Sequence, residues 1–254
     1  MKKVILLSVI ISLLITGSAF QSNFKSSASF QPVAVIELFT SQGCSSCPSA
    51  DQLLSQTINE AKKDGRKIFA LSFHVDYWNR LGWADPFSTK EYSQRQRAYA
   101  AQLNDNSVYT PQMIVNGSMQ FVGSDEKDLK DALDKSLHTL PTAAFKTLIA
   151  ALQNNTPPQV KFSLDGNYAG CNINFALVSL SETTSIKRGE NGGLTLTNEN
   201  VVRQFISVPA TAEGIINFKA SPLPSGNNMA IVAYLQQSNN LKIIGAAMAE
   251  IKWQ

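Results

Sequence analysis

The stretch VAVIELFTSQGCSSCPSADQLL, residues 33–54, contains the features that decide the expected fold. Residues 33–40 are apolar on both alternating faces except at Glu37, which is typical of a strand buried in a sheet that is covered on both sides. Cys44 and Cys47 follow, and Pro48 begins a segment with helical apolar spacing that ends at Asp64-Gly65. We therefore expect a strand, a CxxC pair and a helix, in that order.

The segments that follow extend this pattern. Residues 67–75 predict a second strand, parallel to the first. Ser88 and Glu91 have capping-box spacing and predict a helix that runs to about residue 103. Asn116-Gly117 separates two short apolar segments and indicates a β-hairpin, and Ser124-Asp125 then caps a further helix.

The order of these elements predicts an α/β thioredoxin-like domain with an inserted helical segment over residues 76–107. Residues 142–152 favour one more helix, and the Asn- and Pro-rich residues 154–158 favour a linker. Short alternating apolar segments then predict a small all-β, sandwich-like domain. The expected division is a signal peptide, a flexible leader, the thioredoxin-like domain and the β domain, at residues 1–19, 20–32, 33–153 and 159–254.

The N-terminus predicts export. Lys2 and Lys3 precede an apolar run over residues 4–15, and small residues follow at 17–19. The run is shorter than the roughly 20 residues of a membrane-spanning helix, although an uncleaved anchor is the alternative. We expect a periplasmic or secreted protein with no stable membrane insertion after cleavage.

The charge balance argues against nucleic acid as a partner. The formal net charge is +3, and Lys2 and Lys3 lie in the segment expected to be removed. A nearly neutral chain lacks the basic surface that contacts to phosphate require. Exported proteins or redox partners of the cell envelope are the expected partners.

The CxxC pair predicts thiol chemistry. A cysteine at a helix N-terminus is stabilised as a thiolate by free N–H groups and the helix dipole, so Cys44 is the expected attacking thiol. Cys47, one turn further in, would then resolve the mixed disulfide. A structural disulfide and a metal site remain open alternatives, but the sequence has no second CxxC and no clustered His pair to complete a zinc site. No cofactor is expected apart from a redox-active Cys44–Cys47 disulfide.

Two further features could assist this chemistry. Thr110-Pro111 stands before the third expected strand, where the thioredoxin fold places a cis-proline against the CxxC sulfurs. Glu37, on the buried strand, could exchange a proton with the resolving thiol, or could be an ordinary hydrogen-bonded strand residue.

Other polar and aromatic residues are candidates for a substrate groove at the edge of the sheet or for simple packing. These candidates are His74, Asp76, Tyr77, Trp78, Trp83 and Tyr109. Cys171 is expected to be a buried apolar residue, with a second resolving thiol as the alternative. His138 is expected to be structural, and the Gly-rich residues 188–193 to form a long turn.

The segments VIELFTSQGCSSCPSADQLL, SFHVDYWNRLGWADPF, RQRAYA and VYTPQMIVNG resemble an uncharacterised family of bacterial secreted proteins. The resemblance continues through RGENGGLTLTNENVVRQ and IIGAAM. That family is catalogued as a domain of unknown function and assigned to the thioredoxin-like superfamily, which implies the fold and export but no substrate. Cys-Ser-Ser-Cys-Pro differs from the Cys-Gly-Pro-Cys of thioredoxins, so their redox potential does not transfer.

Two functions are compatible with these features. One is an exported thiol-disulfide oxidoreductase acting on protein or small-molecule thiols. The other is a non-catalytic binding module with a structural disulfide. A copper chaperone using His74 and the two thiolates is a weaker alternative, because copper-delivery proteins of that fold space their cysteines by three residues rather than two.

Overall fold

The computed structural model describes residues 30–105, 107–152, 157–219 and 228–253. The expected signal peptide and most of the expected leader lie outside these residues. Within the described part of the chain, no helix combines the length and the hydropathy needed to cross a membrane.

The strand–CxxC–helix–strand prediction is confirmed. β1 (Ala34–Thr40), α1 (Cys47–Asp64) and β2 (Ile68–His74) follow in order, and β1 pairs with β2 in parallel. Every residue of β1 is buried. α1 ends at Gly65, whose left-handed φ of 67° suits a residue without a Cβ atom.

The next elements also match, with one shift. After the 3₁₀ turn η1 (Asn79–Leu81) come α2 (Lys90–Gln102), β3 (Gln112–Val115), β4 (Met119–Val122) and α3 (Glu126–Leu137). The side chain of Thr89, rather than Ser88, caps α2, accepting from the N–H of Tyr92. Asn116 and Gly117 turn the β3–β4 hairpin with φ values of 47° and 66°.

The second half consists of strands. They are β5 (Ala143–Leu152), β6 (Gln159–Gly166), β7 (Cys171–Ser185), β8 (Thr195–Pro209), β9 (Glu213–Asn217), β10 (Met229–Gln237), β11 (Ile243–Glu250) and β12 (Lys252–Trp253). The helix expected over residues 142–152 is wrong. Its Ala and Leu residues favour a helix locally, but β5 pairs with β6 and buries Ala150 and Leu152 against the sheet.

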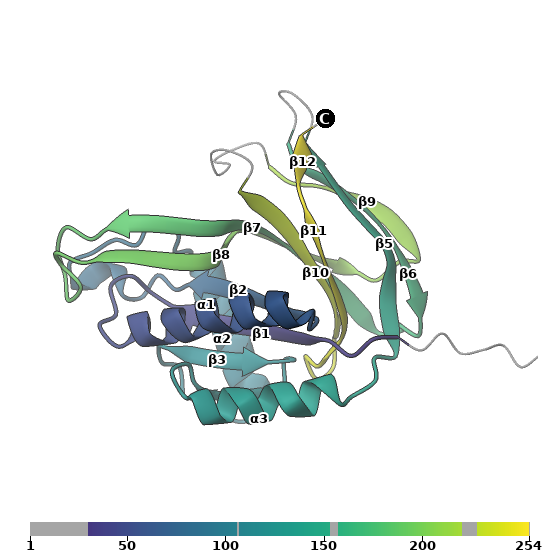
Figure 1. The fold of residues 1–254 in the computed structure, drawn as a ribbon, viewed down its shortest axis with the longest axis horizontal. Helices are drawn as coiled ribbons and strands as arrows, with labels where there is room; N and C mark the ends of the chain where they lie inside the picture. Colours follow the sequence, from purple (N-terminus) through teal and green to yellow (C-terminus); the bar gives the residue numbers. More distant parts are fainter. Residues whose placement is uncertain (1–29, 106, 153–156, 220–227, 254) are drawn as a thin grey trace, which may run out of the picture.

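The expected fold class is also wrong. The strands of the second half do not form a sandwich beside a separate thioredoxin-like core, because β7, β8, β10 and β11 continue the sheet that contains β1–β4. The order of this mixed eight-stranded sheet is β11-β10-β7-β8-β2-β1-β3-β4, and β5, β6, β9 and β12 form a second sheet (Figure 1). The chain is thus mostly β, and α2 is a layer on the large sheet rather than an insertion into an α/β core. The apolar alternation of the later segments correctly indicated strands, but it contains no information about which sheet they join.

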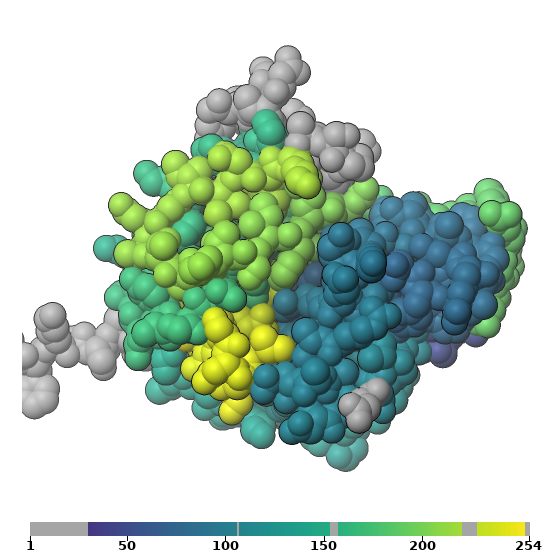
Figure 2. Space-filling view, turned by 180° about the vertical axis from the view of Figure 1, so that it is seen from behind, coloured from purple at the N-terminus to yellow at the C-terminus, as the bar shows by residue number. Residues whose placement is uncertain are grey.

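The two faces of the long strands explain the layers. On β10, Ile231 and Ala233 pack toward the second sheet, whereas Val232 and Tyr234 pack toward β1, β2 and α2. A third apolar cluster lies between β1, β3, α1 and α3. Seen from behind, the light-green residues of β8 and β9 adjoin the blue segment around α2, and yellow C-terminal residues lie below the light-green ones, also against the blue (Figure 2). Tyr234 of β10 and Ile243 of β11 belong to the same apolar cluster as Tyr92 of α2. The C-terminal strands therefore complete the core around α2.

Candidate functional site

The disulfide lies at the beginning of α1. Cys44 and Cys47 are bonded to each other, with their Cα atoms 5.4 Å apart, and Cys47 is the first residue of the helix. Both cysteines are fully buried, while Ser45 and Ser46 between them are exposed. The predicted pair therefore exists in the oxidised form, with its sulfur atoms under the surface.

Thr110 and Pro111 lie against this disulfide. The Thr110–Pro111 peptide is cis, and the Thr110 carbonyl oxygen is 3.9 Å from Cys44 Sγ. Trp78 holds Thr110 in place, since its Nε1 donates to Thr110 Oγ1 at 2.7 Å. The structure thus brings together three groups that the sequence singled out from three different segments.

The other aromatic candidates surround the same loop but are held by their own partners. Trp83 Nε1 donates to Gln42 Oε1 at 3.2 Å, and Tyr77 donates from its hydroxyl to Gln96 Oε1 at 3.2 Å. Gln96 also donates to the Tyr109 carbonyl oxygen at 2.7 Å. These bonds tie the segment after β2 to α2 and to the residues before Pro111.

Asp76 anchors the segment to α2. Its backbone N–H donates to Ser93 Oγ at 3.1 Å, and the Ser93 hydroxyl donates to Asp76 Oδ1 at 2.5 Å. The backbone N–H and the carboxylate of Asp76 both bind Ser93, so Asp76 holds the segment after β2 against α2.

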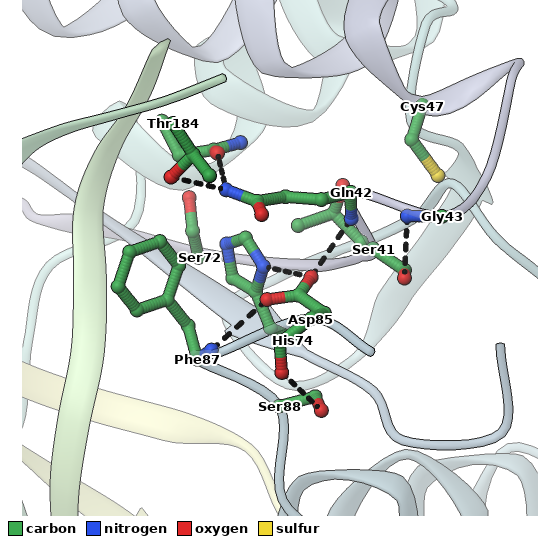
Figure 3. A network of polar contacts seen from close by, with 12 residues as sticks. Ser41, Gln42, Gly43, Cys47, Ser72, His74, Asp85, Phe87, Ser88 and Thr184 are labelled. Atoms are coloured by element: carbon green, nitrogen blue, oxygen red, sulfur yellow. Dashed lines mark hydrogen bonds and ion pairs between the residues drawn. The ribbon is translucent and has the colours of Figure 1, made fainter. Parts of the chain in front are cut away.

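His74 lies beneath this region and is completely buried. Its Nδ1 is 2.7 Å from Asp85 Oδ2, and the same oxygen accepts from the backbone N–H of Gln42 at 2.8 Å (Figure 3). Burial alone lowers the pKa of His74, but the Asp85 carboxylate outweighs burial and holds that pKa above its ordinary value. Burial alone raises the pKa of Asp85, and His74 holds it below its ordinary value. The pair is a buried ionic contact that supports the residues just before Cys44.

Asp51 is a buried acid that sequence reasoning missed. It lies one helical turn after Cys47, and its Oδ2 accepts from Thr40 Oγ1 at 3.3 Å. Burial raises its pKa from 3.8 to about 6. Asp51 also lines a cavity of about 230 Å³ between α1 and the start of β8. Its spacing of four residues from Cys47 was the available signal, because such residues share a helix face.

Three polar atoms of this cluster are buried without a hydrogen-bond partner among the described residues: Asp51 Oδ1, His74 Nε2 and Asn198 Nδ2. Gln42 links the cluster to β8 and β7, since its Nε2 donates to Asn198 Oδ1 at 3.1 Å and to Thr184 Oγ1 at 3.0 Å. Buried polar groups without partners are uncommon, and a functional role is one of the explanations for them. Asp85 and Asn198 were missed because they lie far from the cysteines in sequence, and Gln42 was missed because no motif singles it out.

Glu37 is placed elsewhere. Arg95 binds both of its carboxylate oxygens, at 2.8 Å and 2.7 Å, and the Tyr234 hydroxyl donates to Oε1 at 2.6 Å. These partners lie on α2 and β10, on the face of β1 that points away from α1. All of these contacts support the reading of Glu37 as a hydrogen-bonded strand residue.

The remaining candidates are structural. Cys171 is a free, buried cysteine at the start of β7, and its thiol contacts the Ala169 carbonyl. His138 caps the end of α3, with Nδ1 2.6 Å from the Asp134 carbonyl oxygen. Across the described ranges, no group of three or more His, Cys, Asp or Glu side chains is arranged to hold a metal ion.

The fold and this site define a mostly β protein with a buried disulfide at the start of its first helix. The chain belongs to a family described as proteins of unknown function, DUF1223, whose model matches residues 35–236. The expected membership of an uncharacterised family is thereby confirmed. A search of curated proteins finds no match.

Two solved structures are similar to different degrees. Protein AGR_C_4864 from Agrobacterium tumefaciens is 28% identical, with a TM-score of 0.66, and the alignment covers 87% of this chain and 95% of that one. A domain of the outer membrane lipoprotein Omp28 from Porphyromonas gingivalis is 11% identical, with a TM-score of 0.26, over 44% of this chain and 98% of that one. The first structure shares the fold along most of its length.

Proposed function

We propose that this protein is an exported thiol-disulfide exchange protein that works through Cys44 and Cys47. The observation that carries the proposal is the disulfide at the N-terminus of α1 with the Thr110 carbonyl beside Cys44 Sγ. Helix N-terminal N–H groups favour the thiolate that exchange requires. A backbone carbonyl beside the sulfur gives an approaching peptide a place to bind.

The exchange step is balanced without any cofactor. A substrate thiolate attacks Cys44 Sγ and forms a mixed disulfide, while the Cys44–Cys47 bond breaks and its electron pair goes to Cys47 Sγ, which takes a proton. A second substrate thiol, after losing its proton, then displaces Cys44, so the substrate dithiol becomes a disulfide and the protein gains two electrons. The reverse sequence reduces a substrate disulfide.

An oxidising compartment fits this chemistry, since disulfides persist outside the cytoplasm. Cell-envelope or exported proteins with thiols are the partners we propose. Export and periplasmic location belong to the proposal, because the N-terminal segment that predicts them lies outside the described residues.

The matched test compares two single variants. Cys47→Ser retains the attacking thiol, and we expect it to accumulate mixed disulfides with periplasmic proteins, while Cys44→Ser does not. Equilibration of the wild-type dithiol with glutathione buffers should give a potential above about −300 mV, the level below which disulfides are structural. A potential below that level, together with equal trapping by the two variants, would contradict exchange.

The second candidate is a binding module with a structural disulfide. Full burial of both cysteines favours it, because a buried disulfide resists attack. The same two measurements separate the candidates, since a structural disulfide predicts the low potential and no trapping.

A further inference from the structure

The tip of the β7–β8 hairpin, residues 186–194, lies against the loop that contains Cys44. Asn191 Nδ2 donates to the carbonyl oxygens of Gln42 and Cys44, at 2.9 Å each. Glu190 Oε2 accepts from the backbone N–H of Ser45 at 3.1 Å. Asn191 is only 3% exposed. The Gly-rich residues that the sequence marked as an ordinary turn therefore contact the backbone on both sides of Cys44.

The hairpin tip is built to approach this closely. A Cβ atom on Gly189 would lie 3.2 Å from the Trp83 Cβ atom, and one on Gly82 would lie 3.1 Å from Gly189 Cα. Both glycines have positive φ values, 80° for Gly189 and 110° for Gly82, which residues with a side chain rarely adopt. Backbone hydrogen bonds such as Gly193 N to the Ile186 carbonyl at 2.9 Å hold the tip in shape. The contact is therefore made by an ordered turn.

The charge of Glu190 complements the start of α1. The helix has no acidic residue in its first turn, and Ser46 makes no side-chain cap. Hydrogen bonding from the Ser45 side chain, and then from its backbone N–H, lowers the pKa of Glu190, so the contact favours the charged carboxylate. Asp85 approaches from the other side through the Gln42 N–H, and Lys187 and Arg188 are the cations on the hairpin tip. In the oxidised protein the Glu190 carboxylate thus binds near the start of α1, where backbone N–H groups would also stabilise a Cys44 thiolate.

We propose that Glu190 and Asn191 are positioning residues for Cys44: Asn191 fixes the backbone around it, and the Glu190 carboxylate disfavours a second negative charge on its sulfur. The inference rests on the proposed function, because it assigns control of the acidity of the attacking thiol. The hairpin tip therefore stabilises the disulfide relative to the dithiol.

Reduction of the disulfide brings two negative charges close together, the Glu190 carboxylate and the Cys44 thiolate. A small dithiol reductant transfers two electrons to the Cys44–Cys47 bond and becomes a disulfide itself, while its protons pass to the two cysteines. Cys44 then loses its proton to the buffer, and the resulting thiolate repels Glu190. By linkage, a contact that weakens on reduction also makes reduction less favourable.

The test uses Glu190→Gln, which keeps an oxygen acceptor for the Ser45 N–H and removes only the charge. Glu213→Gln, at an exposed position on β9, is the matched control. The pKa of Cys44 is measured from the pH dependence of its alkylation by iodoacetamide in the reduced protein. Mass spectrometry identifies which cysteine is alkylated. We expect Glu190→Gln to lower the pKa of Cys44 by about 0.5 to 1 unit, because removing a nearby negative charge favours the thiolate. About 1 M salt should remove most of the difference.

The dithiol–disulfide equilibrium gives the second measurement. In a dithiothreitol buffer, Glu190→Gln should shift the equilibrium toward the dithiol by about 3- to 10-fold at pH values above the Cys44 pKa. Asn191→Ala should accelerate reduction of the disulfide, because two backbone carbonyls lose their donor. Identical titration curves for Glu190→Gln and Glu213→Gln would overturn the inference. Neither measurement needs a substrate protein, so the inference can fail while exchange is confirmed, and it can hold while exchange fails.

Discussion

Two buried charged clusters lie on opposite faces of β1, and they differ in how fully their hydrogen bonds are made. In the Glu37–Arg95 cluster, both carboxylate oxygens are bound, and Tyr234 adds a further bond. In the His74–Asp85–Asp51 cluster, Asp51 Oδ1 and His74 Nε2 are buried without partners in the described structure. A closed pair fixes the fold, whereas an open cluster beside the disulfide retains groups that can change protonation.

Two acids near the first strand play different parts in the structure. Glu37 connects β1 to α2 and β10, which are far apart in sequence. Asp51 stands on α1 near Cys47, with its pKa raised to about 6. The buried acid closest in sequence to the dithiol is therefore on the helix, and the one on the strand belongs to the core.

The largest expected effect comes from opening the closed cluster. Arg95→Met leaves the Glu37 carboxylate buried without its cation, and we expect a loss of about 4–5 kcal/mol in the free energy of unfolding, the upper part of the range for such changes. Chemical denaturation at neutral pH measures this loss. Lys127→Met removes an exposed pair with Asp131 on α3 and is the control, with little expected loss. Equal losses for the two variants would show that the cluster is no special anchor.

Breaking the His74–Asp85 pair should have the next largest effect. Asp85→Asn is expected to destabilise the protein by about 3 kcal/mol, because an amide oxygen still accepts one backbone N–H but no longer pairs with His74. The folded pKa of His74 is raised, so its contribution is present below about pH 6.5 and is lost as pH rises through the folded value.

The contribution of Asp85 to stability depends on pH in the opposite direction. Its folded pKa is lowered, so its contribution is present above about pH 3.9 and is lost as pH falls through the folded value. The difference in stability between wild type and Asp85→Asn should therefore be greatest between about pH 4 and 6.5. A difference that stays constant from pH 3 to 9, measured by denaturation across that range, would contradict an ionic pair.

Asp51→Asn should stabilise the protein, and only at higher pH. Because burial raises the Asp51 pKa to about 6, the charged form is disfavoured in the folded state, and its stability contribution is lost as pH rises from 3.8 through that value. We expect a gain of about 2–3 kcal/mol at pH 8 that disappears below pH 4. Asp64→Asn, at the exposed end of the same helix, should show no such dependence.

The smallest effect should come from the contact between the aromatic segment and Thr110. Trp78→Phe removes the bond from Nε1 to Thr110 Oγ1 and should cost about 1 kcal/mol. The more informative readout is the alkylation rate of reduced Cys44, which should change if Trp78 positions the Thr110 carbonyl. Unchanged stability and unchanged reactivity would mean that Thr110 is held by other contacts.

Local patterns predicted the elements near the disulfide well. The helix after Cys47 and the Asn116-Gly117 hairpin depend on spacing and turn chemistry within a few residues, which tertiary contacts seldom override. The helix expected at residues 142–152 failed for the opposite reason, because Ala and Leu propensities there are weak compared with pairing to β6. The fold class failed at the same level, since alternation identifies a strand but gives no sheet order.

The candidate site divides in the same way. Cys44, Cys47, Thr110 and Trp78 were found by motif and by position in the chain, and the structure brings them together. Asp85 and Asn191 were not found, because each contacts the disulfide loop from a distant segment, and Gln42 was not found because no motif singles it out.

The sequence by itself determined the CxxC pair, the helix that begins at it and the hairpin that follows, because these depend on residues within one or two turns of each other. Only the tertiary structure decided that β7–β11 extend the sheet of β1 and that Glu190 and Asn191 contact the loop around Cys44. Those contacts join residues about 145 positions apart. They depend on strand order and register, which are set by the burial of whole faces and by no local pattern.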